Sequence, residues 1–168
     1  MAVVNLKGSR IMTPIAASPA TKAAPGTGGG AVRSWTETVE VTASDSETST
    51  YLLARLPSNA RIMGLSTFSW DDLSTDGTST MDLGVFNQSG KSDITDDPDA
   101  LSNGHAITGA SSALVIGEKA DYGIQLWDHA TGTTDPVAML DIKATLNDLA
   151  VTAAGGGTIT IELLYTLD

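Results

Sequence analysis

The sequence predicts an all-β protein, an antiparallel β-sandwich that is jelly-roll-like and is preceded by an extended N-terminal arm. Three observations predict this fold class. From Trp35 onward, short stretches of alternating apolar and polar residues recur, which is the pattern of half-buried strands. Turns rich in glycine, aspartate and serine separate these stretches. No long helical pattern interrupts them, and seven or eight short strands at this spacing are typical of a sandwich or a barrel.

The N-terminal segment has a composition unlike that of the rest of the chain. Three prolines and the sequence GTGGG at 26–30 disfavour a long helix and favour an extended, hinged course. The segment is nevertheless too apolar for a simple linker, and apolar side chains of this kind often become ordered against a partner. We therefore predict a docking arm over residues 1–34 and a β-sandwich domain over residues 35–168. The residues expected to form the contact are Val3, Val4, Leu6, Lys7, Arg10, Ile11, Met12 and Ile15.

The charge of the chain is unevenly distributed. The 168 residues have a formal net charge of −11, from 20 acidic and 9 basic residues. Residues 1–34 carry four bases and no acid, whereas all 20 acids lie in the remaining residues. An acidic body repels phosphates, so we expect no nucleic-acid partner. The basic arm suits an acidic protein surface, although four bases over this length also fit a merely solvated segment. No run approaches the roughly 18 apolar residues of a membrane helix, so no membrane partner is expected.

The first expected strands lie on either side of a tight turn. The stretch WTETVEVTA at 35–43 is rich in threonine and valine, which suit a pleated surface. The stretch TYLLARL at 50–56 ends at a proline, and LPSNARI then turns the chain into the alternating run at 60–70. Arg55 and Arg61 lie beside this turn and are two of the few bases available to pair with the acidic body.

The later strands follow the same pattern of alternation between turns. They are expected at 79–87, 113–117, 122–128, 137–146 and 157–167. In the first of these, one apolar face is formed by Met81, Leu83 and Val85. In the last, the apolar face is formed by Ile159, Ile161, Leu163, Tyr165 and Leu167.

One helical turn is expected between these strands, in the sequence DDPDALSNG at 96–104, with its cap at Asp97. Asp97 can cap a helix, and Pro98 suits the first helical position. Asp99 complements the helix dipole, and Gly104 can end the helix.

The residues that could carry catalysis do not form a recognisable motif. A Ser-His-Asp arrangement can be drawn because His129 follows Asp128 and serines are frequent, but no G-x-S-x-G sequence supports it. His105 is the other histidine, and the chain has no cysteine, which excludes a thiolate nucleophile and a disulfide. The sequence therefore predicts no enzyme, no catalytic residue and no cofactor.

Acidic residues offer a weak case for a metal site. An EF-hand alignment over 72–83 places Asp72, Ser74, Asp76 and Gly77 correctly, but Leu83 stands where a bidentate glutamate is required. A second cluster could bind calcium, although helix capping accounts for most of it. Its members are Asp93, Asp96, Asp97 and Asp99. The carboxylate pairs that a glycosidase would need lie in predicted turns; they are Asp71–Asp72 and Asp96–Asp97. We predict no metal site.

Glycines and aromatic residues have structural explanations as well. The GTGGG sequence lacks the lysine and serine or threonine of a phosphate-binding loop, so we interpret it as a hinge. The tryptophans and tyrosines could stack on sugars if they faced outward, but core packing is the preferred interpretation. They are Trp35, Trp70, Trp127, Tyr51, Tyr122 and Tyr165.

Four stretches together resemble the head decoration (cement) proteins of tailed bacteriophages. They are LARLPSNARIMGLS at 53–66, TSTMDLGVFNQSG at 78–90, DPDALSNG at 97–104 and LNDLAVTAAGGGTITIELLYTLD at 146–168. The resemblance covers residues 34–168 and concerns β-architecture, with no active site to carry over. It implies a structural virion protein, made in the host cytoplasm, that binds the outer capsid surface. Its partners would be major capsid protein subunits, which it bridges, and further copies of itself in a homodimer or homotrimer. The alternative is a carbohydrate- or receptor-binding head-fibre module that uses an exposed tryptophan or tyrosine.

Overall fold

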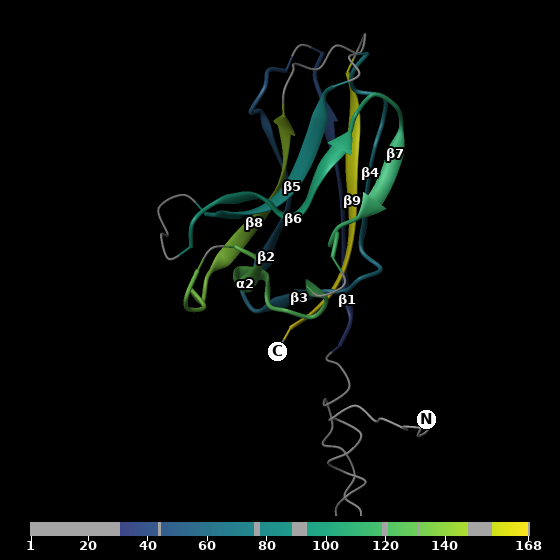
Figure 1. Ribbon diagram of the computed structural model, residues 1–168. Coiled ribbons are helices and arrows are strands. Elements are labelled where there is room, and N and C mark those ends of the chain that lie inside the picture. Colours follow the sequence, from purple (N-terminus) through teal and green to yellow (C-terminus); the bar gives the residue numbers. More distant parts are fainter. Residues whose placement is uncertain are drawn as a thin grey trace, which may run out of the picture. The chain divides into compact units, whose positions relative to one another are not determined.

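The computed structural model describes residues 31–43, 45–75, 78–88, 94–118, 121–130, 132–147 and 156–167. Most of the predicted arm lies outside these ranges, including all of its expected contact residues. Within them the chain forms nine strands and one short α-helix (Figure 1). The elements are β1 (Arg33–Val41), β2 (Thr50–Pro57), β3 (Ala60–Ile62), β4 (Thr67–Trp70), β5 (Thr80–Asn87), β6 (Asp97–Ala106), β7 (Ser111–Leu114), α2 (Leu126–His129), β8 (Met139–Asn147) and β9 (Gly157–Leu167).

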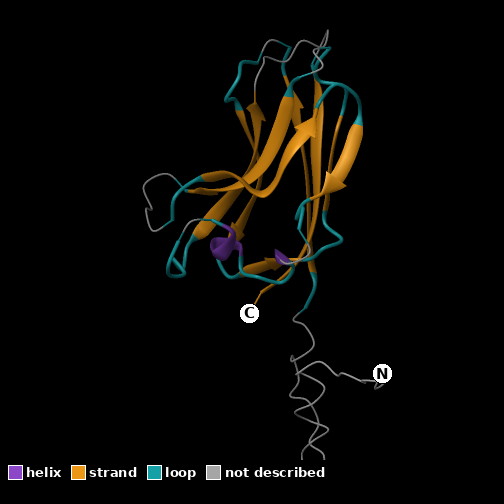
Figure 2. Cartoon of the chain, in the orientation of Figure 1, coloured by secondary structure: helices purple, strands orange, loops and turns teal. Residues whose placement is uncertain are grey.

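Two antiparallel sheets pack face to face (Figure 2). Sheet A has the order β1-β9-β4-β7, and the short β3 also pairs with β9. Sheet B has the order β2-β8-β5-β6. The chain passes repeatedly from one sheet to the other, so that β1 and β2 lie in different sheets, as do β8 and β9. This strand order is that of a jelly roll. The predicted antiparallel, jelly-roll-like sandwich is confirmed.

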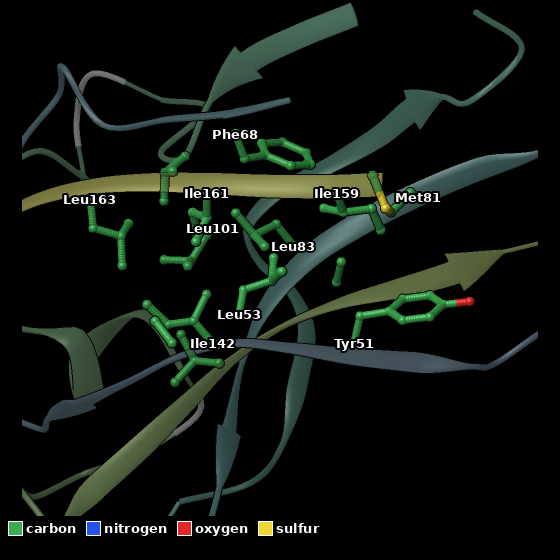
Figure 3. Close-up of a cluster of buried hydrophobic side chains, with 14 of the residues drawn as sticks. Tyr51, Leu53, Phe68, Met81, Leu83, Leu101, Ile142, Ile159, Ile161 and Leu163 are labelled. Carbon is green, nitrogen blue, oxygen red and sulfur yellow. The ribbon is translucent and has the colours of Figure 1, made fainter. Parts of the chain in front are cut away.

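The hydrophobic core lies between the two sheets (Figure 3). Every second residue of β9 points inward, and Ile159, Ile161 and Leu163 are at most 1% exposed. From sheet B, Leu83 and Ile142 are both 0% exposed. Burying one such side chain contributes about 1.5–3 kcal/mol, so the alternation of β5, β8 and β9 holds the layers together. The predicted inward faces of β5 and β9 are confirmed.

The helical turn predicted at 97–104 is wrong, because these residues belong to β6. Strand β6 is the last strand of sheet B, and an edge strand tolerates Pro98 because its missing N–H is not needed there. The chain also runs directly over Gly84 of β5: a Cβ added to Gly84 would lie 2.1 Å from the carbonyl oxygen of Asp97. Tertiary pairing with β5 therefore overrides the local capping signals.

The strand predicted at 122–128 is also wrong. These residues form a turn that leads into α2, and Gly123 has a φ of 81°, which a regular strand does not contain. Leu126 is 0% exposed, and the backbone N–H of Trp127 donates to the carbonyl of Ser58 at 3.2 Å. The helix thus packs beside β3 at one end of the sandwich (Figure 1). An apolar run of this length cannot distinguish a strand from a short buried helix.

Other boundaries differ by smaller amounts. The run expected at 60–70 forms two strands, β3 and β4, because the chain turns between them and the Ser66 N–H bonds the Met63 carbonyl at 2.9 Å. The strand expected at 113–117 begins earlier, as β7, because Ser111 pairs with Trp70. The LPSNARI turn between β2 and β3 lies where it was predicted.

Candidate interaction surface

His105 is half-buried beside the aromatic residues of the core. It lies in β6, and its ring makes an edge-to-face contact with Phe68 at a centroid distance of 4.9 Å and a tilted contact with Trp70 at 5.4 Å. Burial lowers the pKa of His105, and the nearby Asp82 carboxylate partly offsets this effect. Its Nε2 atom is buried and has no hydrogen-bond partner among the described residues. The side chain therefore stays neutral inside the fold at neutral pH.

His129 ends α2 and is half-buried as well. Burial lowers its pKa, while Asp121 and Asp128 act in the opposite direction. Its Nε2 atom also lacks a hydrogen-bond partner in the described part of the chain. The Ser-His-Asp arrangement drawn from the sequence needs a histidine nitrogen bonded to a serine hydroxyl, and neither Nε2 makes that bond there.

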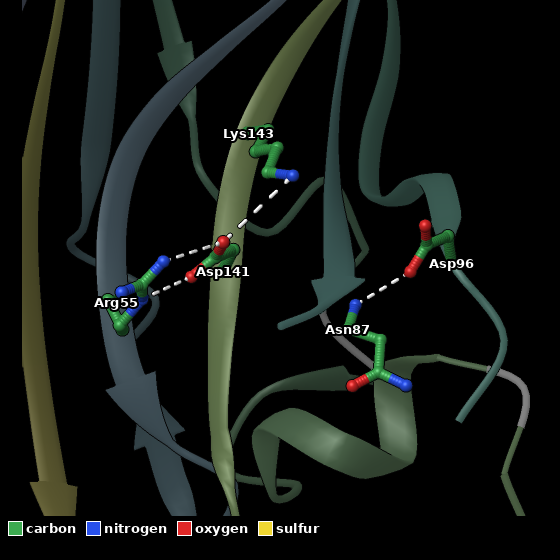
Figure 4. A network of polar contacts seen from close by, with 5 residues as sticks. All are labelled: Arg55, Asn87, Asp96, Asp141 and Lys143. Carbon is green, nitrogen blue, oxygen red and sulfur yellow. Dashed lines mark hydrogen bonds and ion pairs between the residues drawn. The ribbon is translucent and has the colours of Figure 1, made fainter. Parts of the chain in front are cut away.

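The acidic residues near the turns stabilise the backbone. Asp71 accepts hydrogen bonds from both the backbone N–H and the hydroxyl of Thr158, each at 2.8 Å, and these bonds lower the pKa of Asp71. Asp96 accepts from the backbone N–H of Asn87 at 2.7 Å, which fixes the chain before β6 (Figure 4). Burial and the adjacent Asp99 raise the pKa of Asp97.

The predicted calcium alternatives gain no support from these contacts. Asp76, Gly77 and Asp93 lie outside the described residues. Among the residues that are described, no group of three or more histidine, aspartate or glutamate side chains could hold a metal ion. In the same ranges, no helix is long and apolar enough to cross a membrane.

The aromatic residues divide between the core and the surface. Trp70 and Tyr51 are 6% and 8% exposed, as core packing predicts. Trp127 is half-buried, and its Nε1–H donates to the Gln125 side chain at 2.7 Å. Trp35 is the most exposed tryptophan at 37%, and its Nε1–H donates to the carbonyl of Leu53 at 3.0 Å. Tyr122 and Tyr165 are half-buried against the core, so a sugar-binding platform would centre on the Trp35 ring, whose polar group is already bonded.

An ion-pair network lies on the outer face of sheet B (Figure 4). Arg55 forms two hydrogen bonds with Asp141, from Nε at 2.6 Å and from Nη2 at 3.1 Å, and these bonds raise the pKa of Arg55. Lys143 lies 3.9 Å from the same carboxylate and 4.8 Å from the centre of the Phe86 ring. Asp141 is 5% exposed, and Arg55 and Lys143 compensate its negative charge. This carboxylate therefore offers little charge to a binding partner.

A bulge in β2 makes this pairing possible. The register with β8 shifts between Leu52 and Ala54. Without that shift, the inward alternation of Tyr51 and Leu53 would continue to Arg55 and place its charge in the core. The predicted pairing of Arg55 with the acidic body is confirmed. Arg61 donates a hydrogen bond to the carbonyl of Gly123, among its contacts.

A hollow of about 390 Å³ lies at the end of sheet B. Beside it, Val137 is 87% exposed and has a φ of 48°, a strained conformation for a β-branched residue. Asp135 holds this turn by accepting from the Val137 N–H at 2.8 Å. The hollow is therefore bordered by an exposed apolar tip. Its lining consists of Pro57, Ser58, Asn59, Gln88, Asp135, Val137, Ala138 and Met139.

Strand β1 presents a second candidate surface. Its nine residues pair with β9 in one uninterrupted register, from Arg33 opposite Tyr165 to Val41 opposite Gly157. Of these nine residues, Val41 is buried, Val39 is half-buried and Trp35 is 37% exposed, and the other six are exposed. Sequence reasoning did not single out this edge. The available signal was the presence of threonine and glutamate on both faces of the run, which a strand enclosed in a sandwich does not tolerate.

Comparison with known proteins identifies the fold in other molecules. No family model matches the chain, and no curated protein does. A chain of the solved structure "Capsid of Ralstonia phage GP4" is similar, with a TM-score of 0.61, 19% identity and coverage of 83% of this chain and 86% of that one. A chain of "Cyanophage Pam1 capsid asymmetric unit" is similar with a TM-score of 0.50, 22% identity and coverage of 90% and 96%, respectively. At these identities the likeness concerns the fold.

Proposed function

We propose that this protein is a structural component of a phage virion, and more specifically a decoration protein that binds the outer surface of the head. The observation that carries the proposal is the shared fold with chains of two phage capsid structures, over more than four fifths of this chain and of each of those chains. The described surface is compatible with a binding role, because both histidines are half-buried with lowered pKa values and the charge of Asp141 is compensated by Arg55.

In this role the protein binds major capsid protein subunits and bridges them. A ligand that binds the assembled shell better than free subunits stabilises the shell by mass action. Many copies on one symmetric shell gain from multivalency, so each contact can be modest. Two regions are suited to the contact: the basic, apolar arm predicted from the sequence, and the exposed tip at Val137 beside its hollow.

The arm supplies the charge that the domain lacks. It carries four bases and no acid, whereas all 20 acids lie in residues 35–168, and its last two residues, Arg33 and Ser34, begin β1. We assign the capsid contact to the predicted arm residues, with Lys7 and Arg10 bonding acidic capsid groups and the apolar residues packing beside them. Copies of the protein also associate with one another in this proposal, as a homodimer or homotrimer.

Binding to heads tests the proposal. Full-length protein is mixed with heads of the encoding phage that lack it, and co-sedimentation is measured together with the heat resistance of the heads. The wild type is expected to sediment with the heads and to raise the temperature at which they rupture. Absence of binding would overturn the decoration role, and a glycan-dependent attachment to host cells would favour the head-fibre alternative.

Matched charge reversals test the arm. Arg10→Glu lies within the predicted contact set, whereas Lys22→Glu changes the same net charge outside it. We expect Arg10→Glu to weaken binding to heads at least about tenfold, and Lys22→Glu to weaken it less than threefold. Equal effects of the two variants would show that only net charge matters and would remove the specific role of the arm residues.

A further inference from the structure

The four strands that end the two strand orders are protected to very different degrees. An edge strand exposes unpaired backbone groups that can pair with another chain, and proteins usually protect such edges by shortening, bulging or covering them. Strand β7 has only four residues. Strand β6 contains two register shifts and a proline, and β2 contains one register shift, where the Trp35 indole bonds its backbone.

Strand β1 has none of these protections. It has nine residues, no proline and no register shift, and no other described strand pairs with its second side. Its first six residues remain exposed on both faces: Trp35 and Glu37 share the face of buried Leu163 and Ile161, yet Trp35 is 37% exposed and Glu37 is exposed. This is the surface expected of a strand that is completed by a partner strand.

The charges along β1 are complementary to themselves. In an antiparallel pair of two β1 strands related by a twofold axis at Trp35, Arg33 lies opposite Glu37 of the second copy, and the reverse pair forms on the other side of the axis. Both side chains then lie on the same face, since residues opposite each other in a ladder share a face. An axis at Glu37 would instead place two glutamates opposite each other, which is unfavourable.

We propose that β1 is the self-association surface of this protein, and that it pairs antiparallel with β1 of a second copy about an axis at Trp35. The two copies of sheet A then join into one continuous sheet, with two Arg33–Glu37 ion pairs across the new ladder. In the single copy, the Glu37 carboxylate accepts a hydrogen bond at 3.2 Å from the Thr38 N–H, and in the dimer it also gains Arg33 and selects this register. The inference specifies the self-association part of the proposed function, and it is tested without phage particles.

Mixed cross-linking measures the register directly. The chain has no cysteine, so introduced thiols are the only ones present. In the proposed register, Ser34 lies opposite Thr36 of the second copy, at a distance suited to a disulfide. Full-length Ser34→Cys and Thr36→Cys should therefore form a covalent dimer when mixed and oxidised, while each alone should not. A Ser111→Cys and Ser112→Cys mixture, on the β7 edge, is the matched control and should remain monomeric on denaturing gels.

Charge exchange measures the ion pairs. We expect Arg33→Glu to weaken the dimer at least about tenfold, and Glu37→Arg likewise, because each variant places like charges opposite each other. The double variant should restore dimerisation to within about threefold of the wild type, as measured by sedimentation equilibrium. Circular dichroism confirms that each variant is folded.

Three results would overturn the proposal: cross-linking of Thr36→Cys alone, which requires another register; a dimer that neither charge variant affects; or a wild type that is monomeric at all concentrations. A monomer that still binds heads would remove this inference and leave the decoration role intact. A dimer that does not bind heads would do the reverse.

Discussion

Strands β6 and β1 are both edge strands of the sandwich, but only β6 is fixed by contacts that a regular strand could not make. At β6, the backbone of Asp97 and Pro98 crosses directly over Gly84, and the N–H of Gly104, at a φ of 68°, donates to Asp82 at 2.7 Å. Strand β1 keeps nine residues in one uninterrupted register with β9, and seven of them are exposed. The irregular backbone of β6 hinders pairing with another chain, whereas the regular backbone of β1 remains able to pair.

The difference between β6 and β1 predicts that one edge affects folding stability and the other affects self-association. Contacts at β6 are made within the chain, so changes there should alter the free energy of unfolding. The free side of β1 makes few contacts within the chain, so changes there should alter self-association and leave stability nearly unchanged. The predictions below test this separation, from the largest expected effect to the smallest.

Gly84→Ala should have the largest effect on stability. The added Cβ would lie 2.1 Å from the Asp97 carbonyl oxygen and 2.3 Å from the Pro98 carbonyl carbon, and backbone atoms cannot move aside by a change of rotamer. We expect a loss of about 3 kcal/mol or more in the free energy of unfolding, measured in urea by tryptophan fluorescence. The control is Gly109→Ala, where no heavy atom lies within 4 Å of the new Cβ. Equal stabilities of the two variants would show that β6 does not depend on its close approach to β5.

Asp82→Ala should have the next largest effect. The Asp82 carboxylate accepts hydrogen bonds from the Gly104 backbone and from the Asn147 side chain, so it ties the bulge of β6 to β5 and β8. Water can replace part of both bonds, and we expect a loss of about 2 kcal/mol. Asp72→Ala removes an exposed aspartate of the same charge and serves as the control. If both variants were equally stable, the anchoring of β6 would depend on packing alone.

The sequence predicted the strands whose pattern is determined by the core. In β5 and β9 apolar residues alternate without interruption, and burial of one face requires that alternation. The pattern fails where distant parts of the chain decide the conformation. Residues 97–104 have the local signals of a helix start, but they form a strand because β5 offers a partner and Gly84 leaves room for Pro98.

The candidate surfaces could be predicted only in part. The excess of bases in residues 1–34 is visible in the sequence. The ion pair of Arg55 with Asp141 joins residues 86 positions apart and depends on a one-residue bulge that no local pattern reveals. The exposure of β1 depends on its place at the end of the strand order, which follows from tertiary topology. Alternation shows which face of a strand is buried but does not show whether its second edge has a neighbour.

His105 should make β6 sensitive to acid. Burial lowers its pKa in the folded state below the value of about 6.5 expected in the unfolded chain. The stability that depends on a neutral His105 is therefore present above pH 6.5 and is lost as the pH falls from that value through the folded-state pKa. We expect the wild type to lose more stability between pH 7.5 and pH 5 than His105→Phe, which keeps an aromatic ring against Phe68.

His129 and Asp71 also make the fold sensitive to acid, but they are present in both proteins, so the difference between the two profiles isolates His105. The measurement is urea unfolding at several pH values. If the free energy of unfolding fell equally with pH in the two proteins, protonation of His105 would be tolerated. The stability of β6 would then not depend on whether this ring is neutral.

Thr38→Val should have the smallest effect and gives the sharpest test of β1. The hydroxyls of Thr38 and Thr160 are 2.9 Å apart on the exposed face of sheet A, and this contact ties β1 to β9. Valine removes the bond but suits a strand equally well, so we expect a change of less than about 0.5 kcal/mol in the free energy of unfolding. Self-association should also stay within about threefold of the wild type, because Arg33 and Glu37 are unchanged. A loss above about 1 kcal/mol would mean that β1 depends on side-chain bonds to β9 as strongly as β6 depends on Asp82, and the distinction between a closed edge and a pairing edge would no longer hold.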